Sequence, residues 1–316
     1  MNFVIRFIFV YFASTCCLQA EEVPETITRL VARPSEIDTG IFEIKIQSKI
    51  LNPKTGESVE PQHIQEFTVA IDGDDWAKRY PNFRHFAVNG SELAASYYEI
   101  RKGEILANQR LTLTRPREPL QSLAEKEVWA KWRLIGAIPR LSIAKYISKT
   151  LPTAHSRTVI DGVRCLVYEY EIKQDQLFEV LTGVHHTMLN AESVTLRLSL
   201  AEDFGFALAR SEVLGPLGSY DVTTSHDFVE VAENIFLPLK WKHFYGPSKG
   251  VERSAVDEIE LKHFKFVNHP LPDDTFSFNI PAGTSVTDER PKRSRQQYYL
   301  PEEVSLSQFL IEIDSE

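Results

Sequence analysis

Hydrophobic and polar residues alternate in short stretches near the start of this 316-residue chain. In GIFEIKIQS, Phe42, Ile44 and Ile46 fall on one side of the pattern, and polar or charged residues fall on the other. The alternation returns in QEFTVAID, with Phe67 and Val69 on one side. Because successive side chains of a strand point to opposite faces, both stretches predict strands with one buried face.

The second half of the chain repeats this pattern. DGVRCLVYEYEI places Leu166 and Tyr168 on one face, and SVTLRLSL does the same with Leu196 and Leu198. The period recurs in SYDVTTSHDFVEV, IFLPLKWKHFY, DEIELKHFKF and TFSFNI. We predict a strand for each stretch. We expect IFLP to end a strand, because Pro238 cannot donate to a ladder and suits an edge or a bulge.

Turn residues separate these strands. Asp72-Gly73 follows one strand, and Asn89-Gly90 lies between two apolar stretches, where both residues tolerate the positive φ of a hairpin turn. Lys102-Gly103 predicts the next turn. Near the end, TFSFNI puts Phe276 and Phe278 on one face, before a Pro-Ala-Gly turn.

A helical period is found in only a few places. We expect a helix over residues 23–33, ended by Pro34, and a second one over 122–135, where Ser122 and Glu125 form a capping box. Residues 139–151 predict a further short helix. The stretch 175–189 is ambiguous, but the spacing of its apolar residues favours a helix.

Together the strands and helices predict an α+β fold. From Thr39 to about Asp288 the spacing of turns indicates one antiparallel sheet system with helices inserted between its strands. The amphipathic helices need a partner for their apolar stripes, and the sheet provides it.

The N-terminal stretch MNFVIRFIFVYFASTCCLQA predicts a secretory signal peptide over residues 1–20, with Arg6, an apolar run and a small residue at the cleavage site. The run is too short for a typical membrane span. The alternative is an uncleaved N-terminal anchor. Cleavage would leave Cys165 as the only cysteine, without a disulfide partner, and we expect it to be buried. We further expect a single domain over 21–290 and a C-terminal tail over 291–316, in which VSLSQFLIEI could dock as a last strand.

Composition and charge limit the classes of partner that this chain is expected to bind. The chain is 43% hydrophobic and 25% charged, as globular proteins are, and its formal charge is −9. Loss of Arg6 with the signal peptide would make the charge −10. A net acidic chain is a poor candidate for binding nucleic acid or an anionic membrane. We therefore expect no nucleic-acid partner.

Motifs of known chemistry are missing from the sequence. It contains no G-x-S-x-G, P-loop, H-E-x-x-H, C-x-x-C or G-x-G-x-x-G. DGDDW at 72–76 lacks the spacing of a calcium loop and predicts a turn. His185 and His186 would point about 100° apart on a helix, which disfavours a shared metal ion. We predict no catalytic residues, no metal and no cofactor, and hence no enzyme. A hydrolase is the weakest hypothesis, because no nucleophile–base arrangement is visible.

Four stretches in a fixed order carry a resemblance to a known family. DGVRCLVYEYEI, VTLRLSLAEDFGFALARSEVL, DFVEVAENIFLPLKWKHFY and NHPLPDDTFSFNIPAGTSVTDER resemble the LolA/LolB-like superfamily of outer-membrane lipoprotein-sorting proteins, best over residues 161–290. The resemblance implies a strongly curved antiparallel sheet, an incomplete barrel, with helices covering its open side. It also implies an apolar concave face that holds acyl chains. The carriers of this family latch their lid with an arginine on an early strand, and neither Arg84 nor Arg110 sits in a matching motif here.

Two functions follow as expectations. The first is an exported periplasmic or envelope protein that binds lipid or lipoprotein acyl chains, with envelope proteins as transfer partners. The second is an exported interaction module whose concave face is filled by its own helices. From strand alternation, the ligand-lining residues of the first are Phe42, Ile44, Ile46, Phe67, Val69, Leu166, Tyr168, Leu196, Leu198, Phe276 and Phe278. Other aromatic side chains serve either core packing or the same lining: Trp76, Trp241, Phe236, Phe244, Tyr245, Phe264 and Phe266.

Overall fold

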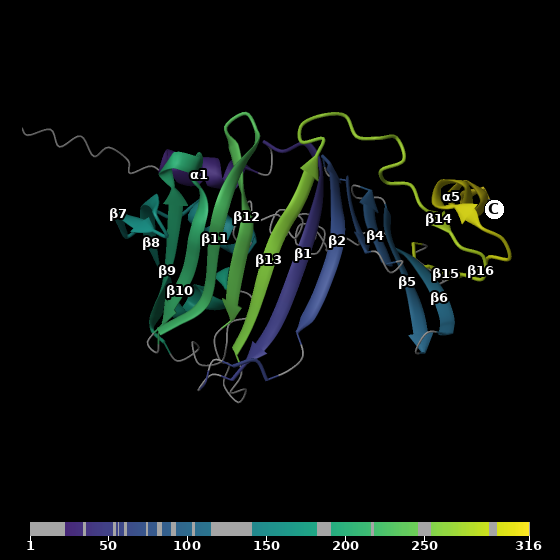
Figure 1. The fold of residues 1–316 in the computed structure, drawn as a ribbon, viewed down its shortest axis with the longest axis horizontal. Coiled ribbons are helices and arrows are strands. Elements are labelled where there is room, and N and C mark those ends of the chain that lie inside the picture. Colours follow the sequence, from purple (N-terminus) through teal and green to yellow (C-terminus); the bar gives the residue numbers. More distant parts are fainter. Residues whose placement is uncertain are drawn as a thin grey trace, which may run out of the picture.

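A large open sheet forms most of the computed structural model (Figure 1). The structure describes residues 23–33, 36–52, 55, 57–59, 62–73, 75–80, 84–89, 93–102, 105–114, 141–181, 191–215, 218–245, 254–290 and 296–315. Fifteen strands share one sheet in the order β16-β15-β6-β5-β4-β3-β2-β1-β13-β12-β11-β10-β9-β8-β7.

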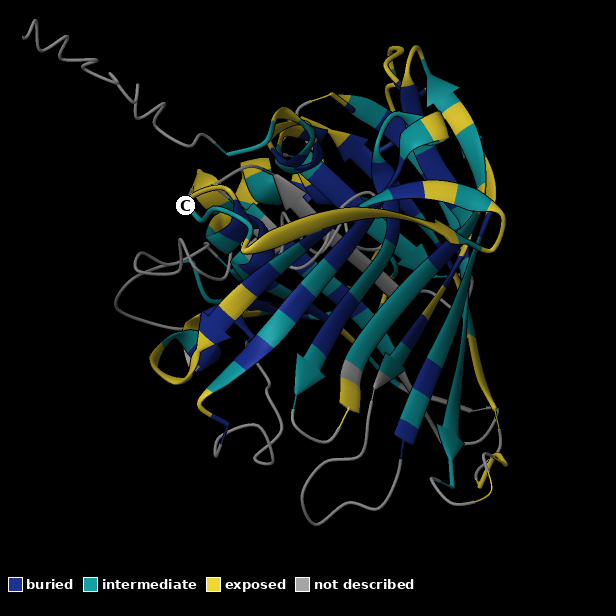
Figure 2. Cartoon of the chain, turned by 90° about the vertical axis from the view of Figure 1, so that its left-hand side faces the viewer, coloured by how far each residue is buried: buried dark blue, intermediate teal, exposed yellow. Residues whose placement is uncertain are grey.

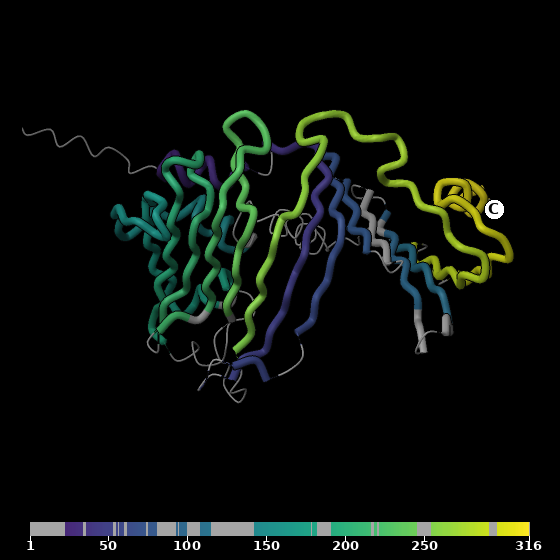
Figure 3. The backbone as a smooth tube through the Cα atoms, in the orientation of Figure 1, coloured from purple at the N-terminus to yellow at the C-terminus, as the bar shows by residue number. Residues whose placement is uncertain are grey.

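Two antiparallel meanders build this sheet. The first consists of β1 (Thr39–Leu51), β2 (His63–Asp72), β3 (Asp75–Tyr80), β4 (Arg84–Asn89), β5 (Leu93–Lys102) and β6 (Ile105–Thr114). The second consists of β7 (Ala154–Ile160), β8 (Val163–Lys173), β9 (Ser193–Ala201), β10 (Ala207–Gly215), β11 (Gly218–Ala232), β12 (Ile235–Tyr245) and β13 (Ser254–Lys265). Figure 3 shows the first strand of one meander beside the last strand of the other, where β1 pairs with β13 from Ile41–Lys265 to Leu51–Ser254. This seam makes one sheet of two local units.

The alternation seen in the sequence follows the cross-strand register. Ile46 is opposite Ile259, which is opposite Trp241, and Ile44 is opposite Phe67. Because directly opposed residues share a face, these side chains lie on one side of the sheet. We call this side the inner face.

The same side continues into the second meander. Tyr170 is opposite Leu196, Leu196 is opposite Val213, and Val213 is opposite Asp221. On the other side, which we call the outer face, Glu43 is opposite Thr68. Most positions of the outer face in the middle of the sheet are polar.

Three short helices cover the inner face at the end formed by β8 to β10. They are α1 (Glu25–Ala32), α3 (Leu141–Ile147) and α4 (Leu177–Val180). The 3-10 turn η2 (Gln174–Gln176) precedes α4, and the 3-10 turn η3 (Glu202–Phe204) lies between β9 and β10. Their apolar side chains join those of the strands in a helix-covered cluster: Ile27, Leu30, Ile143, Ile147, Tyr168, Tyr170, Ile172, Leu177, Val180, Leu181, Ala191, Val194, Leu196, Leu198, Leu200, Leu208 and Val213. Figure 2 shows how the sheet bends around this end of the molecule. The predicted fold class, a strongly curved antiparallel sheet with helices on its open side, is confirmed.

A buried arginine ties α1 to the sheet. Arg33, 2% exposed, donates from its guanidinium to the carbonyl oxygens of Phe236 (3.0 Å) and Gly205 (2.7 Å). Burial lowers the pKa of Arg33, and the nearby Glu36 partly offsets that effect. These bonds place the C-terminal end of α1 at the turns before β10 and β12.

The last part of the chain covers the outer face at the opposite end. It contains β14 (Asn279–Ile280), β15 (Ser285–Asp288), β16 (Gln296–Tyr299), β17 (Val304–Ser305) and α5 (Leu306–Asp314). Apolar residues from these elements meet β5 and β6 in a C-terminal cluster: Ala95, Tyr97, Leu111, Leu113, Ile280, Val286, Leu300, Leu306 and Phe309. Residues 296–315, expected as a tail, are therefore part of the folded body, because β16 extends the main sheet and α5 buries an apolar face against it.

Two expectations about this region need correction. The stretch TFSFNI is a strand only at Asn279–Ile280, and it pairs with β17 in a separate two-stranded sheet. Before it, Thr275 and Ser277 bond back through both amide and hydroxyl to the carbonyls of Pro272 and Asp274, which favours turns over a ladder. The main sheet is also not wholly antiparallel, because β15 returns beside β6 in parallel.

Other expectations are confirmed by the described elements. The helices expected at 23–33 and 139–151 correspond to α1 and α3, and the stretch 175–189 begins with η2 and α4. Pro238 does not end its strand, because β12 continues to Tyr245, but it lies where β12 pairs with β11 and not with β13, as its missing donor requires. The expected signal peptide at 1–20 and the expected helix at 122–135 lie outside the described residues, as do His185 and His186.

Candidate ligand-binding face

Five of the expected lining residues lie together in the middle of the inner face. Phe42, Ile44, Phe67 and Val69 are at most 3% exposed, and Ile46 packs against them while partly exposed. We call their surroundings the central cluster, whose buried members are Ile37, Phe42, Ile44, Phe67, Val69, Ile71, Ile235, Leu237, Trp241, Leu261 and Val267. It spans the seam between the two meanders.

The central cluster continues into accessible apolar surface. Its partly buried neighbours are Ile46, Tyr80, Val231, Ala232, Leu239, Ile259 and Phe264. None of the helices among the described residues contributes a side chain to this cluster. The middle of the inner face thus differs from the end under α1, α3 and α4.

Four other expected lining residues lie under those helices. Leu196 and Leu198 are fully buried in the helix-covered cluster, Tyr168 is 6% exposed, and Leu166 packs against the cluster from its edge. The hydroxyl groups of Thr26 in α1 and Tyr168 are hydrogen-bonded at 2.6 Å. The protein's own helices fill this part of the inner face.

Phe276 and Phe278 lie apart from the other nine residues. Phe278 packs against the C-terminal cluster, with its ring centre 6.1 Å from that of Tyr97, on the outer face. Phe276 lies in the turn before it and belongs to none of the three clusters. The structure does not bring these two phenylalanines to the inner face, because the chain crosses to the outer side after β13.

The structure adds Lys78 and Tyr80, which the sequence reasoning missed. Lys78 is opposite Val69 and therefore on the inner face. Its Nζ lies 3.9 Å from the ring centre of Phe67 and 4.9 Å from that of Tyr80. The alternation of Trp76, Lys78 and Tyr80 in DWAKRY is the signal that could have found them, since Trp76 is opposite the inner-face residue Ile71.

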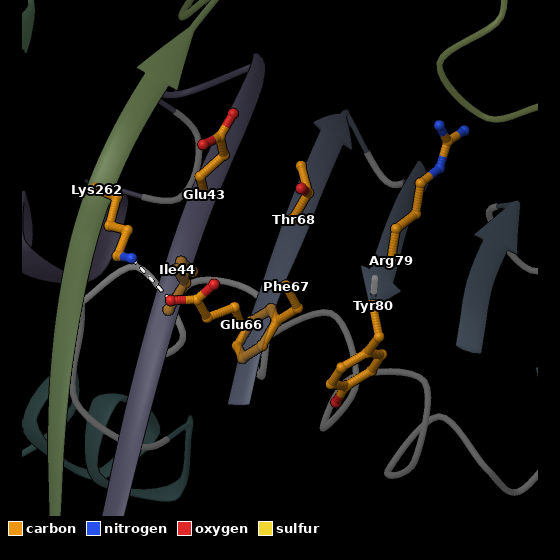
Figure 4. Close-up of a pocket in the computed structure, with 8 residues that line it drawn as sticks. All are labelled: Glu43, Ile44, Glu66, Phe67, Thr68, Arg79, Tyr80 and Lys262. Carbon is orange, nitrogen blue, oxygen red and sulfur yellow. Dashed lines mark hydrogen bonds and ion pairs between the residues drawn. The ribbon is translucent and has the colours of Figure 1, made fainter. Parts of the chain in front are cut away.

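A pocket of about 380 Å³ lies across β13, β1, β2 and β3 (Figure 4). It is lined by Glu43, Ile44, Glu66, Phe67, Thr68, Arg79, Tyr80 and Lys262. The cross-strand pairs Glu43–Thr68 and Thr68–Arg79 place its polar side chains on the outer face. These groups would not favour an acyl chain.

Much of the charge in this pocket is already paired. Lys262 donates to Glu66 at 2.7 Å, and that bond holds the pKa of Glu66 below its usual range. Arg79 donates to the carbonyls of Thr275 and Ser277, where the chain crosses toward β14. These contacts indicate a structural role for the polar side chains of this pocket.

The described residues offer neither a metal site nor a membrane-spanning helix. Within the described ranges, no group of three or more His, Cys, Asp or Glu side chains could hold a metal ion. The helices of those same ranges are all too short or too polar to cross a membrane. Cys165 is a free, buried thiol whose pKa is raised by burial, as expected for a structural cysteine.

Comparison with solved structures found similar chains of low sequence identity. A LolA superfamily protein from Nitrosomonas europaea is 13% identical, with 81% of this chain and 98% of that chain covered and a TM-score of 0.40. An outer-membrane lipoprotein-sorting protein domain from Vibrio parahaemolyticus is 10% identical, covers 80% and 94%, and has a TM-score of 0.39. The lipoprotein LppX of Mycobacterium tuberculosis is 10% identical, covers 78% and 96%, and has a TM-score of 0.27.

Two of these structures carry the name of the superfamily, or of its lipoprotein-sorting proteins, that the sequence resembles. No family model matches the chain, and no curated protein matches its sequence. The function is therefore argued from the side chains of the inner face.

Proposed function

We propose that this chain is an exported cell-envelope protein that binds a lipid or another apolar ligand on the central cluster and serves lipid or lipoprotein transfer. The observation that carries the proposal is the accessible apolar rim of that cluster, formed by Ile46, Tyr80, Ile259 and their neighbours. Each CH₂ group of an acyl chain moved from water onto such a surface contributes about 0.8 kcal/mol. Binding and release by affinity alone require no bond to be made.

Export and the transfer partner are part of the same proposal. Residues 1–20 have the pattern of a signal peptide, and a carrier that crosses an aqueous compartment needs this route. The partners would be envelope proteins or lipoproteins that present acyl chains. The ligand-lining set that we propose is the central group Phe42, Ile44, Ile46, Phe67 and Val69.

The helix-covered cluster supports a second candidate function. There, α1, α3 and α4 already fill the inner face, as in an interaction module that carries no ligand. This candidate predicts that no part of the inner face binds an apolar molecule.

A fluorescence titration separates the two functions. The neutral probe N-phenyl-1-naphthylamine should bind the purified protein, and Ile46→Gln should weaken the binding about tenfold, because a polar amide then enters the apolar rim. The control is Lys45→Gln, whose position is adjacent in the sequence but on the outer face. Mass spectrometry of lipids extracted from the purified protein should also identify an acyl-chain compound. An unresponsive probe together with a lipid-free extract would favour the interaction module.

A further inference from the structure

One inner-face lysine differs from lysines on the outer face, because no carboxylate of the described residues forms an ion pair with it. Four lysines on outer-face positions of the strands, Lys49, Lys240, Lys242 and Lys262, each have Nζ within 3.6 Å of a carboxylate oxygen. Lys78 lies on the opposite side of the sheet, and among the described residues its Nζ contacts two aromatic rings and no carboxylate. Its charge is thus held beside apolar surface, and the described part of the chain supplies no anion to it.

The backbone explains why Lys78 points this way. In β3 the buried Trp76 and the partly buried Tyr80 alternate with Ala77 and Arg79, so Lys78 shares the face of the aromatic residues. Its opposite residue, Val69, is fully buried in the central cluster. The rings of Phe67 and Tyr80, with centres 5.4 Å apart, hold the ammonium by cation–π attraction.

We propose that Lys78 binds the anionic head group of a single-chain amphiphile whose tail lies on the central cluster. This inference rests on the proposed function and names the chemistry of its ligand. A carboxylate or phosphate beside Nζ would form a charge-assisted hydrogen bond, which is about twice as strong as a neutral one. It would also supply a counter-charge that none of the described side chains gives to Lys78.

The geometry suits an elongated molecule. Three strand spacings of about 4.8 Å separate β3 from β13, so the apolar track from Lys78 across Val69 and Phe42 to Phe264 is about 14 Å wide. Phe264, at the far end of this track, is partly buried and packs against the central cluster. A medium-length acyl chain with its head at Lys78 would cross the seam between the two meanders.

Three ligands with the same alkyl chain test the proposal. Dodecanoate, dodecyl phosphate and dodecanol are titrated at neutral pH against bound N-phenyl-1-naphthylamine. Wild-type protein should bind at least one of the two anions about tenfold more tightly than dodecanol, the effect expected of a hydrogen bond to a charged group. The anion that binds more tightly identifies the head group as carboxylate or phosphate. Equal affinity for all three ligands would overturn the proposal without any mutation.

Variants then assign the preference to this side chain. Lys78→Met keeps the length of the stem over the two rings and should abolish the preference for the anion, while dodecanol affinity changes little. Lys78→Arg should retain the preference. Lys45→Met removes the same charge from the outer face and should have no effect. An equal loss of anion affinity in Lys78→Met and Lys45→Met would contradict a specific site. Failure of wild-type protein to bind even dodecanol would instead overturn the proposed lipid-binding function.

Discussion

Charged residues on the two faces of the sheet have different surroundings. On the outer face, Glu212 is 5% exposed and accepts hydrogen bonds from Ser219 and Arg210, with Arg197 at 3.6 Å. Burial alone would raise the pKa of Glu212, but the hydrogen bonds and the two arginine charges outweigh it and lower that pKa. On the inner face, the Nζ of Lys78 lies over the rings of Phe67 and Tyr80, and none of the described carboxylates forms an ion pair with it.

The lowered pKa of Glu212 predicts a specific loss of stability in acid. A carboxyl group whose pKa is lower in the folded state stabilises the protein fully above the unfolded pKa of about 4.3, and this contribution disappears as the pH falls through the folded value. We expect Glu212→Gln to cost about 1–3 kcal/mol in the free energy of unfolding at neutral pH and to weaken its dependence on pH below about 4. Urea unfolding of both proteins across this range measures the difference. Curves that stay parallel down to the most acidic pH would contradict the assignment.

At the scale of secondary structure, the C-terminal segment stabilises one end of the sheet. Phe309 of α5 is 3% exposed, and its ring packs edge-on against Tyr298 at 5.6 Å between centres. At the end of the same segment, Arg290 joins Asp288 of β15 to Asp314 of α5, at 2.8 and 2.9 Å. Both contacts attach α5 to the outer face of the main sheet.

A pair of substitutions in α5 tests this attachment. Phe309→Ala should lower the free energy of unfolding by about 3 kcal/mol, because it leaves a cavity between α5 and the sheet. Ile311 lies on the same helix but is 71% exposed, so Ile311→Ala should change stability by less than about 0.5 kcal/mol. Thermal and urea unfolding measure both. Similar small losses in the two variants would mean that α5 does not contribute to the core.

The sequence predicts individual strands and helices better than it predicts which elements pair or pack together. An alternation of apolar and polar residues identified β1, β2, β8 and β9, because each of these strands has one apolar face. The same alternation predicted that Phe42 and Phe67 share a face, as they do. The apolar residues of VSLSQFLIEI indicated that this stretch could dock as a last strand, but only Val304–Ser305 is a strand and Leu306–Asp314 is the helix α5. Short-range patterns contain no signal for the parallel pairing of β15 with β6, since it depends on contacts between distant residues. The sequence also offered no prediction for Lys78. A lysine between two aromatic positions interrupts the alternating apolar pattern, so the stretch was not recognised as an apolar face.

At the scale of the whole molecule, one seam defines the candidate binding face. The pairing of β1 with β13 joins residues more than two hundred positions apart and unites the inner faces of both meanders. The central cluster takes side chains from both sides of the seam, including Phe67 of β2 and Trp241 of β12. A ligand on this cluster would therefore contact both halves of the chain.

A photoreactive lipid tests this account most directly. Dodecanoate with a diazirine in its tail is bound to the protein, activated by light and located by peptide mass spectrometry. We predict adducts on β1, β2, β3, β12 and β13, at inner-face side chains such as Ile46, Tyr80 and Ile259, and competition by unlabelled dodecanoate. Adducts at outer-face positions such as Lys45 and Thr68, or labelling no stronger than that of urea-unfolded protein, would contradict a ligand site on the inner face.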